Sequence, residues 1–280
     1  MNIQWYPGHM TKAKRAIEKD VKLVDVVIIL LDARAPISSQ SMEMGHLSHK
    51  KLIFALNKID LADKSITKLW EEEFKAQNKN SALLKADQGK GINRITALAE
   101  QVMAEKLANN KRRGRIFTPI RAMVAGVPNV GKSTFINSFV KKAVTKTADR
   151  PGVTRSNQWI KINKSFELLD TPGMLTPKFE SQDIGLNLAF IGSIGYNLDN
   201  YSLVIHLIKK LQKIYPKALQ KRYGIEFNEN AEPLLEAVAK KRGLFIKGGE
   251  LDLNRCANMV LEDFRSKKLG EISLEKPGDL

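Results

Sequence analysis

The hydrophobic pattern differs between the first 178 residues and the rest of the chain. Unbroken apolar runs such as VVIILL (26–31) and LIFAL (52–56) are typical of strands that are buried on both faces of a parallel sheet. Segments with helical spacing lie between these runs, so strands and helices alternate. After about residue 178 strand patterns almost vanish. The pattern therefore predicts an α/β domain over residues 1–178, with a mainly parallel sheet and flanking helices, and a smaller α-helical domain over residues 179–280.

Later elements of the first domain are also visible in the pattern. The helical segment that starts at Ile92 is followed by NNKRRGR (109–115), which breaks the periodicity, and we predict that this basic stretch is an exposed connector. IRAMVAG (120–126) predicts a strand, and NQWIKI (157–162) with FELLD (166–170) predicts a strand pair.

The sequence GVPNVGKS (126–133) matches the phosphate-loop pattern G-x-x-x-x-G-K-[ST], and it has the strand before it and the helix after it that the motif requires. Glycines let backbone N–H groups curl around phosphate oxygens, and the helix N-terminus adds its positive end. We expect Lys132 to reach the β- and γ-phosphates and Ser133 to ligate Mg²⁺. The predicted phosphate-binding residues are Asn129, Val130, Gly131, Lys132, Ser133 and Thr134.

The segment LLDTPG (168–173) resembles the second half of such a site. An apolar strand delivers Asp170, which we expect to hold Mg²⁺ through water, and Gly173 offers a backbone N–H to the γ-phosphate. The pattern D-x-x-G is weak alone but gains weight downstream of a phosphate loop. Thr154, in DRPGVTR between the two motifs, is predicted to complete the Mg²⁺ shell in the triphosphate state, and Thr147 is the second candidate.

The tetrapeptide NKID (57–60) ends a predicted buried strand and fits the guanine-reading pattern N-K-x-D. The carboxylate of Asp60 can accept hydrogen bonds from guanine N1–H and N2–H₂, whereas adenine offers neither donor there, so ATP would leave Asp60 unpaired. We expect Asn57 to orient the loop and touch the base, and the stem of Lys58 to cover the ring face. In LKAD (84–87) the backbone of Lys85 and Ala86 is predicted to supply the second base-contacting loop.

The motifs occur in the order base, base, phosphate, first switch, second switch. This is a circular permutation of the usual order, and it is physically permissible because strands pair in space rather than by chain order. One mechanical consequence is that the second switch leads directly into the helical domain. Nucleotide state could therefore set the orientation of that domain, with a passive covalent tether as the alternative.

Charge and composition indicate the kind of partner and the cellular compartment. The net charge is +16, and residues 1–179 hold 31 basic against 16 acidic residues, while residues 180–280 hold 15 against 14. This regional excess predicts a polyanionic partner, and we favour nucleic acid over membrane phosphate. No apolar run approaches the roughly 18 residues of a bilayer span. The single cysteine, Cys256, fits a reduced compartment. We therefore expect a cytoplasmic protein without membrane contact, and a monomer.

The chain resembles a known family over nearly its whole length. The permuted motif order, WYPGHM at the start, DARAP (32–36), GVPNVGKST (126–134), DRPGVTRSNQW and YPKALQKRYG are similar to the ribosome biogenesis GTPase A (YlqF/RbgA) family of circularly permuted GTPases. The resemblance implies a GTPase that acts on late intermediates of the large (50S) ribosomal subunit. It also implies GTP or GDP with Mg²⁺ as ligands, and a C-terminal helical domain that helps bind ribosomal RNA.

Two residues bear on catalysis, because Met174 stands where Ras-like proteins carry a water-positioning glutamine. Asn129 resembles the potassium-coordinating asparagine of cation-dependent GTPases, and a K⁺ there would supply positive charge beside the phosphates; a loop-shaping asparagine is the alternative. His9 could approach the γ-phosphate and orient water, and a surface histidine after a Pro-Gly turn is an equal alternative. The predicted catalytic residues are thus Lys132, Thr154 and His9.

These observations predict a GTP-hydrolysing assembly factor that binds ribosomal RNA in pre-50S particles. Isolated turnover is expected to be slow and the particle is expected to activate it. The alternative is an RNA-binding assembly factor that senses GTP with little hydrolysis.

Overall fold

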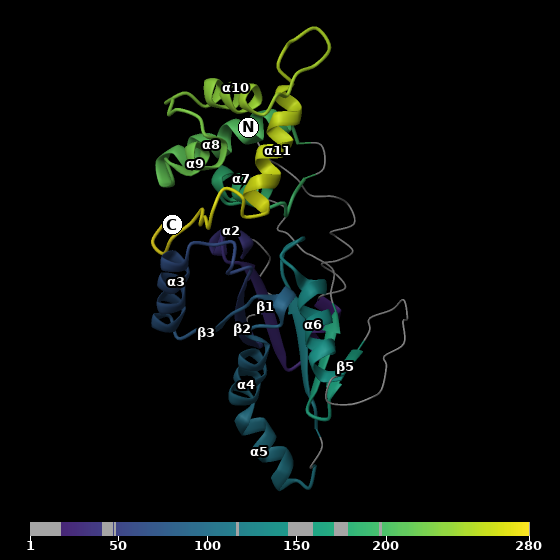
Figure 1. The fold of residues 1–280 in the computed structure, drawn as a ribbon. Helices are drawn as coiled ribbons and strands as arrows, with labels where there is room; N and C mark the ends of the chain where they lie inside the picture. The colour runs from purple at the N-terminus through teal and green to yellow at the C-terminus, as the bar shows by residue number, and fades with distance from the viewer. Residues whose placement is uncertain are drawn as a thin grey trace.

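The computed structural model describes residues 18–40, 47, 49–115, 118–144, 159–170, 179–195 and 198–279, with the backbone alone at 142–144 and 170. In this part of the chain a sheet is covered by helices, and a group of further helices lies beyond one end of the strands (Figure 1). The α/β architecture with a C-terminal helical region is confirmed. The predicted boundary at residue 178 lies outside the described residues, so it stays a prediction.

The sheet has six strands in the order β3-β2-β1-β4-β6-β5. All neighbours pair in parallel except β5, which runs antiparallel to β6. The predicted strands, including the late strand pair, are therefore confirmed. Their bounds are β1 (Val26–Asp32), β2 (Lys51–Asn57), β3 (Asn80–Leu83), β4 (Ile120–Ala125), β5 (Trp159–Asn163) and β6 (Phe166–Asp170).

Successive residues of the central strands enter two different cores. Val26, Ile28 and Leu30 of β1 face a core with the helices α4 and α6, whereas the alternate β1 residues face a core with Trp70 and Phe74 of α3. Because both faces are covered, the strands need no polar side, which explains the unbroken apolar runs. The helices around the sheet are η1 (Val21–Leu23), α2 (Pro36–Ser39), α3 (Lys64–Ala76), η3 (Ala86–Gln88), α4 (Ile92–Val102), α5 (Ala104–Arg112) and α6 (Lys132–Val144).

The basic connector differs from its prediction. Residues 109–112 belong to helix α5, and no residue of that helix is buried. The helical segment breaks at Met103 instead, which separates α4 from α5. Residues 104–108 lie in the segment that was predicted helical, whereas the last turn of α5 has no apolar side chain to extend the periodicity, so the pattern ended too early. The exposure of this basic stretch was predicted correctly.

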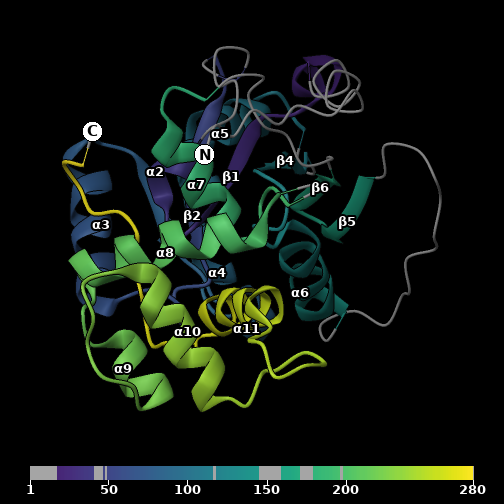
Figure 2. The same cartoon turned by 90° about the horizontal axis from the view of Figure 1, so that it is seen from above.

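The C-terminal region, in its described part, consists of helices joined by loops, and its apolar side chains join the core that α4 and α6 form with the sheet. Viewed from above, α7 and α8 lie next to β1 and β2, and α10 and α11 lie towards the side of α4 and α6 (Figure 2). In the described part of the chain no helix is both long and apolar enough to cross a membrane. The helices are α7 (Gln182–Phe190), α8 (Asn200–Ile214), α9 (Ala218–Tyr223), α10 (Ala231–Lys241) and α11 (Leu253–Arg265).

After α11 the chain returns to the sheet domain. The N–H of Leu274 donates to the Arg34 carbonyl at 2.7 Å, and the N–H of Ile272 donates to the Leu61 carbonyl at 3.0 Å. The buried carboxylate of Glu275 accepts hydrogen bonds from the N–H groups of Ile37 (2.6 Å) and Ser38 (3.1 Å) at the start of α2. It also accepts from Asn187 Nδ2 of α7 at 2.9 Å. One side chain thus joins α2, α7 and the C-terminal segment.

We expect Glu275→Ala to lower the free energy of unfolding by about 2–4 kcal/mol, because several buried donors lose their acceptor. Glu271→Ala is the matched control, since the Glu271 carboxylate is partly exposed and pairs with exposed Lys64 and Lys267. Glu271→Ala should lower the free energy of unfolding by less than about 1 kcal/mol. Urea unfolding of both variants checks the difference, and equal losses would contradict the role given to Glu275.

Candidate functional site

The loops that follow four strands meet at one edge of the sheet. Asp32 at the end of β1 is paired in register with Asn57 at the end of β2, and Val124 of β4 is paired with Asp170 at the end of β6. The carboxyl ends of parallel strands are where ligands bind in open α/β sheets. The guanine-reading motif, the phosphate loop and the DTPG motif therefore start from this edge despite their permuted order.

The phosphate loop has the close packing that its glycines predict. At Gly131 φ is +102°, and a Cβ atom there would lie 2.5 Å from Asn57 Nδ2. At Gly126 a Cβ would lie 2.8 Å from the Leu30 carbonyl oxygen. The ammonium of Lys132 donates to the carbonyl oxygens of Gly126 (3.1 Å) and Val127 (3.0 Å), so its charge lies over the loop. Ser133 and Thr134 are exposed in the first turn of α6.

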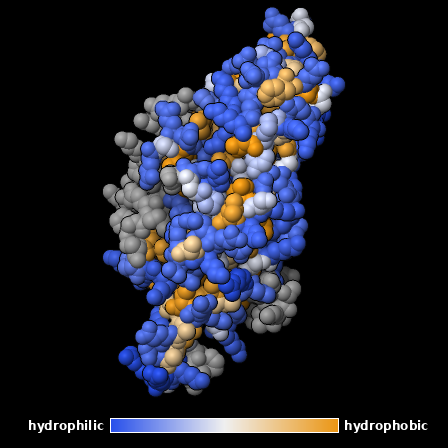
Figure 3. All heavy atoms as spheres, turned by 90° about the vertical axis from the view of Figure 1, so that its left-hand side faces the viewer, coloured by the Kyte–Doolittle hydropathy of each residue, from blue (hydrophilic) through white to orange (hydrophobic). Residues whose placement is uncertain are grey.

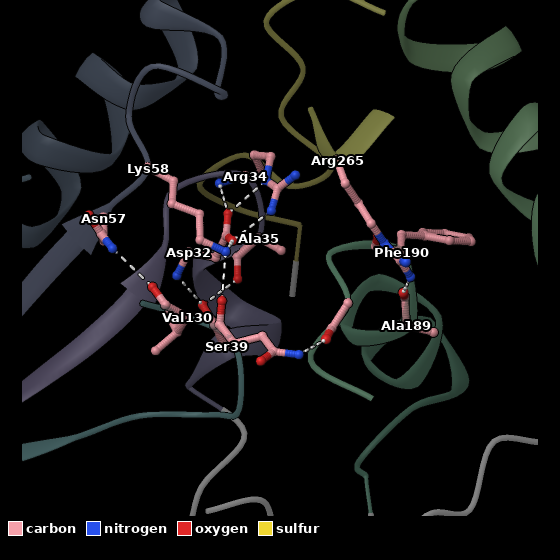
Figure 4. Close-up of polar contacts among 12 residues, drawn as sticks. Asp32, Arg34, Ala35, Ser39, Asn57, Lys58, Val130, Ala189, Phe190 and Arg265 are labelled. Atoms are coloured by element: carbon pink, nitrogen blue, oxygen red, sulfur yellow. Dashed lines mark hydrogen bonds and ion pairs between the residues drawn. The ribbon is translucent and has the colours of Figure 1, made fainter. Parts of the chain in front are cut away.

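Asn57 joins the base-reading loops to the phosphate loop. It is 3% exposed. Its Nδ2 donates to the Val130 carbonyl at 3.0 Å (Figure 4). Its Oδ1 accepts from the Ala86 N–H at 3.0 Å. The orienting role predicted for Asn57 thus has a geometric basis. The same bond occupies the Ala86 N–H, although the backbone of Ala86 was predicted to contact the base.

Lys58 connects the guanine-reading loop to a buried aspartate. Its ammonium donates to the Asn129 carbonyl at 2.7 Å and lies 3.1 Å from Asp32 Oδ2. Asp32 is fully buried and also accepts from Arg34 Nε (2.9 Å) and Nη2 (2.8 Å) (Figure 4). Although burial disfavours the charged form, the cations of Arg34 and Lys58 hold the pKa of Asp32 well below its ordinary value. A permanent negative charge therefore fixes Lys58 beside the phosphate loop.

Asp60 lies beyond the end of β2, in the turn that precedes α3. Its Oδ2 lies 3.1 Å from Lys85 Nζ, and its side chain is 29% exposed. The carboxylate is thus accessible to a base edge and has a cation from the second base-contacting loop beside it. The two motifs, which are far from the phosphate loop in the sequence, form one site with it.

The phosphate loop also contacts the helical region directly. Asn129 Nδ2 donates to the Gly192 carbonyl at 2.7 Å, in the turn that follows α7. Arg265 of α11 fixes this turn through the carbonyl oxygens of Phe190 (3.0 Å) and Ala189 (2.9 Å) (Figure 4). The motif order predicted a connection through the chain after DTPG, and this contact is a second connection, through space.

Several predicted site residues lie outside the described residues. These are His9, Thr147, Thr154, Gly173 and Met174, and the side chain of Asp170. Their roles stay predictions. For Asp170 the backbone at the end of β6, beside β4, agrees with a place next to the phosphate loop.

Sequence reasoning missed two charged residues of this site, Asp32 and Arg34. DARAP was used as a family resemblance and was given no chemical role. The available signal was the position of Asp32, because it directly follows the unbroken apolar run of residues 26–31. A charge at the end of a buried strand is costly unless it is paired.

This fold and site define a P-loop protein that binds a guanine nucleotide, and comparisons with known proteins specify it further. A family model described as "50S ribosome-binding GTPase" matches residues 121–241. The chain is 41% identical to "Ribosome biogenesis GTPase A" of Bacillus licheniformis over 100% of both chains. It is 33% identical to the protein of that name from Thermotoga maritima, over 99% of this chain and 96% of the relative.

Solved structures agree with these relatives. The crystal structure of GNP-bound YlqF from T. maritima is similar with a TM-score of 0.66 and 29% identity, covering 96% of this chain and 100% of that one. The GDP-bound structure of the T. maritima protein has a TM-score of 0.67 and 30% identity, covering 95% and 100%. The chain belongs to the ribosome biogenesis GTPase A family, and it is a GTPase with the motif order of a circular permutation.

Proposed function

We propose that this GTPase assists late maturation of the large (50S) ribosomal subunit, binds ribosomal RNA in pre-50S particles, and hydrolyses GTP faster when bound to them. The observation that carries the proposal is the similarity along the full length to proteins named ribosome biogenesis GTPase A, since it includes both the nucleotide loops and the helical region. The regional basic charge supports a polyanionic partner. We also propose that the protein acts in the cytoplasm as a monomer.

In this proposal the chain positions GTP for attack by water. Asp60 reads the guanine edge, while Lys132 and the backbone from Asn129 to Thr134 hold the phosphates. Mg²⁺ would be held by Ser133, Thr154 and, through water, Asp170, and when bound it neutralises charge on the β- and γ-phosphates. The donor set fits this ion, because hydroxyl and carboxylate oxygens are the ligands that Mg²⁺ prefers. The exposed position of Ser133 in the first turn of α6 fits as well.

Co-sedimentation with large subunits tests the proposed function. We expect more protein in the 50S pellet with a GTP analogue than with GDP or without nucleotide, and a steep loss of binding with added salt. Small (30S) subunits serve as the control particle. Equal binding to both particles in all nucleotide states would contradict the proposal.

The second candidate is an RNA-binding assembly factor that senses GTP with little hydrolysis. The contact of Asn129 with the turn after α7 fits this sensor as well as it fits a hydrolysing GTPase. In a sensor, the phosphate loop must touch the helical region so that the bound nucleotide can change that region. Multiple-turnover hydrolysis separates the two, since the sensor would release little phosphate even on saturating 50S particles.

Substitution of His9 tests its predicted role in orienting the attacking water. If His9 orients the attacking water, His9→Ala should lower particle-stimulated kcat by roughly 100-fold with little change in the KM for GTP. His49→Ala is the matched control, because His49 is exposed and lies before β2. Full particle-stimulated turnover of His9→Ala would remove His9 from the mechanism.

Exchange of monovalent cations tests the potassium proposal for Asn129. If the Asn129 side chain helps to hold K⁺ beside the phosphates, GTP turnover should be faster in KCl than in NaCl. We expect a difference of roughly 10-fold or more, because the ion would supply positive charge to the transition state. Asn129→Ala should remove this difference. A variant that turns over more slowly but keeps the preference for KCl would assign Asn129 to the Gly192 contact alone.

A further inference from the structure

The short hairpin between α10 and α11 exposes two large apolar side chains that are adjacent in the sequence. Phe245 is 51% exposed and Ile246 is 47% exposed, although the preceding Leu244 is buried. In Figure 1 the loop between these helices projects from the helical region, away from the sheet. Figure 3 shows apolar side chains among hydrophilic ones at this upper end of the molecule. Two exposed apolar side chains on neighbouring positions indicate a contact segment more than an isolated one does.

Backbone hydrogen bonds hold the hairpin in one shape. Phe245 and Leu251 form an antiparallel bridge, and the Ile246 N–H donates to the Glu250 carbonyl at 2.9 Å. Gly248 and Gly249 supply the left-handed turn with φ of +106° and +87°, where another residue would be strained. A contact residue on such a preorganised loop loses little conformational entropy when it binds a partner.

Residues 240–250 hold four exposed cations against one exposed acid, Glu250. Lys240, Lys241 and Arg242 are exposed at the end of α10, and Lys247 is exposed in the hairpin itself. The Arg242 guanidinium lies 5.2 Å from the ring centre of Tyr223, so the basic ends of α9 and α10 are adjacent. Residues 180–280 carry nearly balanced charge as a whole, so this grouping is local.

A purely structural explanation accounts for part of this pattern. Lys240 and Lys241 favour the negative end of the α10 dipole, and Glu232 favours its positive end. That explanation covers neither Lys247, which lies outside the helix, nor the exposure of two apolar side chains. Exposed apolar side chains with a local excess of cations fit a partner that has both flat rings and phosphates.

We propose that Phe245 and Ile246, together with Lys240, Lys241 and Lys247, form a contact surface for unpaired RNA. A base stacks on the ring of Phe245, and the lysines neutralise the flanking phosphates. Stacking on aromatic side chains is the common way in which proteins hold single-stranded bases, because each base has a π-face. This inference rests on the proposed function. It specifies which part of the chain contacts RNA and that the contacted RNA is unpaired.

The chain offers a matched control at the other end of α10. Phe227 is 55% exposed, slightly more than Phe245, but Glu226 and Glu229 are exposed beside it. Its apolar exposure is therefore equivalent while its charge surroundings oppose a polyanion. Substitution of Phe227 should change solubility and folding as much as substitution of Phe245, without an effect on RNA.

The test measures binding of the full chain to two RNA probes by fluorescence anisotropy. The probes are an unstructured uridine-rich oligonucleotide and a fully paired RNA duplex of the same length. Phe245→Ala should weaken binding of the single strand by roughly 5- to 100-fold and leave duplex binding unchanged. Phe245→Trp should retain the affinity, because the indole ring also stacks, and Phe227→Ala should behave as the unaltered protein.

The outcomes separate this inference from the proposed function. If Phe245→Ala and Phe227→Ala bind the single strand equally while the unaltered protein still co-sediments with 50S subunits, the RNA surface is overturned and the proposed function stands. If Phe245→Ala loses co-sedimentation but keeps oligonucleotide affinity, the hairpin contacts a ribosomal protein and the RNA surface is again overturned. If the unaltered protein does not co-sediment, the proposed function itself fails.

Discussion

Asp60→Asn should change the nucleotide that this GTPase prefers. The carboxylate accepts from guanine N1–H and N2–H₂, whereas asparagine places an N–H₂ donor against one of these donors. We expect kcat/KM for GTP to fall by roughly 10²–10⁴-fold, as for a site that loses its matched polar contact. Xanthine has a carbonyl in place of the 2-amino group, so the variant should prefer xanthosine triphosphate. Hydrolysis assays with both nucleotides measure the change.

Asp87→Asn is the matched control for this substitution. Asp87 is exposed in η3, close in the sequence to the second base-contacting loop. It should keep the preference for GTP. If Asp60→Asn bound GTP as well as the unaltered protein does, Asp60 would not be the guanine reader. Recovery with xanthosine triphosphate also excludes misfolding as the cause of the lost GTP activity.

Asp32→Ala should cause the largest loss of stability among the substitutions considered. It leaves the buried Arg34 guanidinium without its carboxylate and frees Lys58 from its partner. Removing one partner of a buried ion pair typically costs about 3–5 kcal/mol, because the other charge stays buried and uncompensated. Guanidinium chloride unfolding measures this loss. The affinity for GTP should also fall, since Lys58 is no longer fixed beside the phosphate loop.

The pH dependence of stability separates the charge of Asp32 from its shape. The folded-state pKa of Asp32 is depressed, so its contribution is present above the unfolded pKa of about 4 and is lost as the pH falls towards the folded value. Asp32→Asn keeps the shape and should weaken this loss of stability between about pH 4 and pH 2. Glu72→Ala, which removes a highly exposed ion pair with Lys68, should stay within about 0.5 kcal/mol at every pH. An Asp32→Asn protein with unaltered acid sensitivity would contradict the account.

The strands and the assembled loops could be predicted from the sequence because they depend on local rules. An unbroken apolar run such as that of β1 predicts a buried strand, and each functional motif follows such a run. Parallel pairing then brings the motifs to one edge whatever their order in the chain. Gly131 shows why the motif is strict, since a Cβ there would displace the side chain of Asn57.

Contacts between distant segments could not be predicted in the same way. Glu275 is separated from α2 by more than two hundred residues, and nothing in its neighbours marks it as buried. The Asn129–Gly192 contact likewise depends on how α7 packs against the sheet domain. The last turn of α5 was missed for the opposite reason, because residues 109–112 are all polar and carry no hydrophobic signal.

Single-turnover GTP hydrolysis with and without large ribosomal subunits tests the central claim most directly. The claim is that the permuted motifs build one GTPase site whose chemistry is completed on the ribosomal particle. We expect slow turnover alone and an increase of at least about 10-fold with 50S or pre-50S particles, absent with 30S subunits. In Asp60→Asn the stimulation should appear with xanthosine triphosphate in place of GTP. A rate that large subunits do not change would contradict the account.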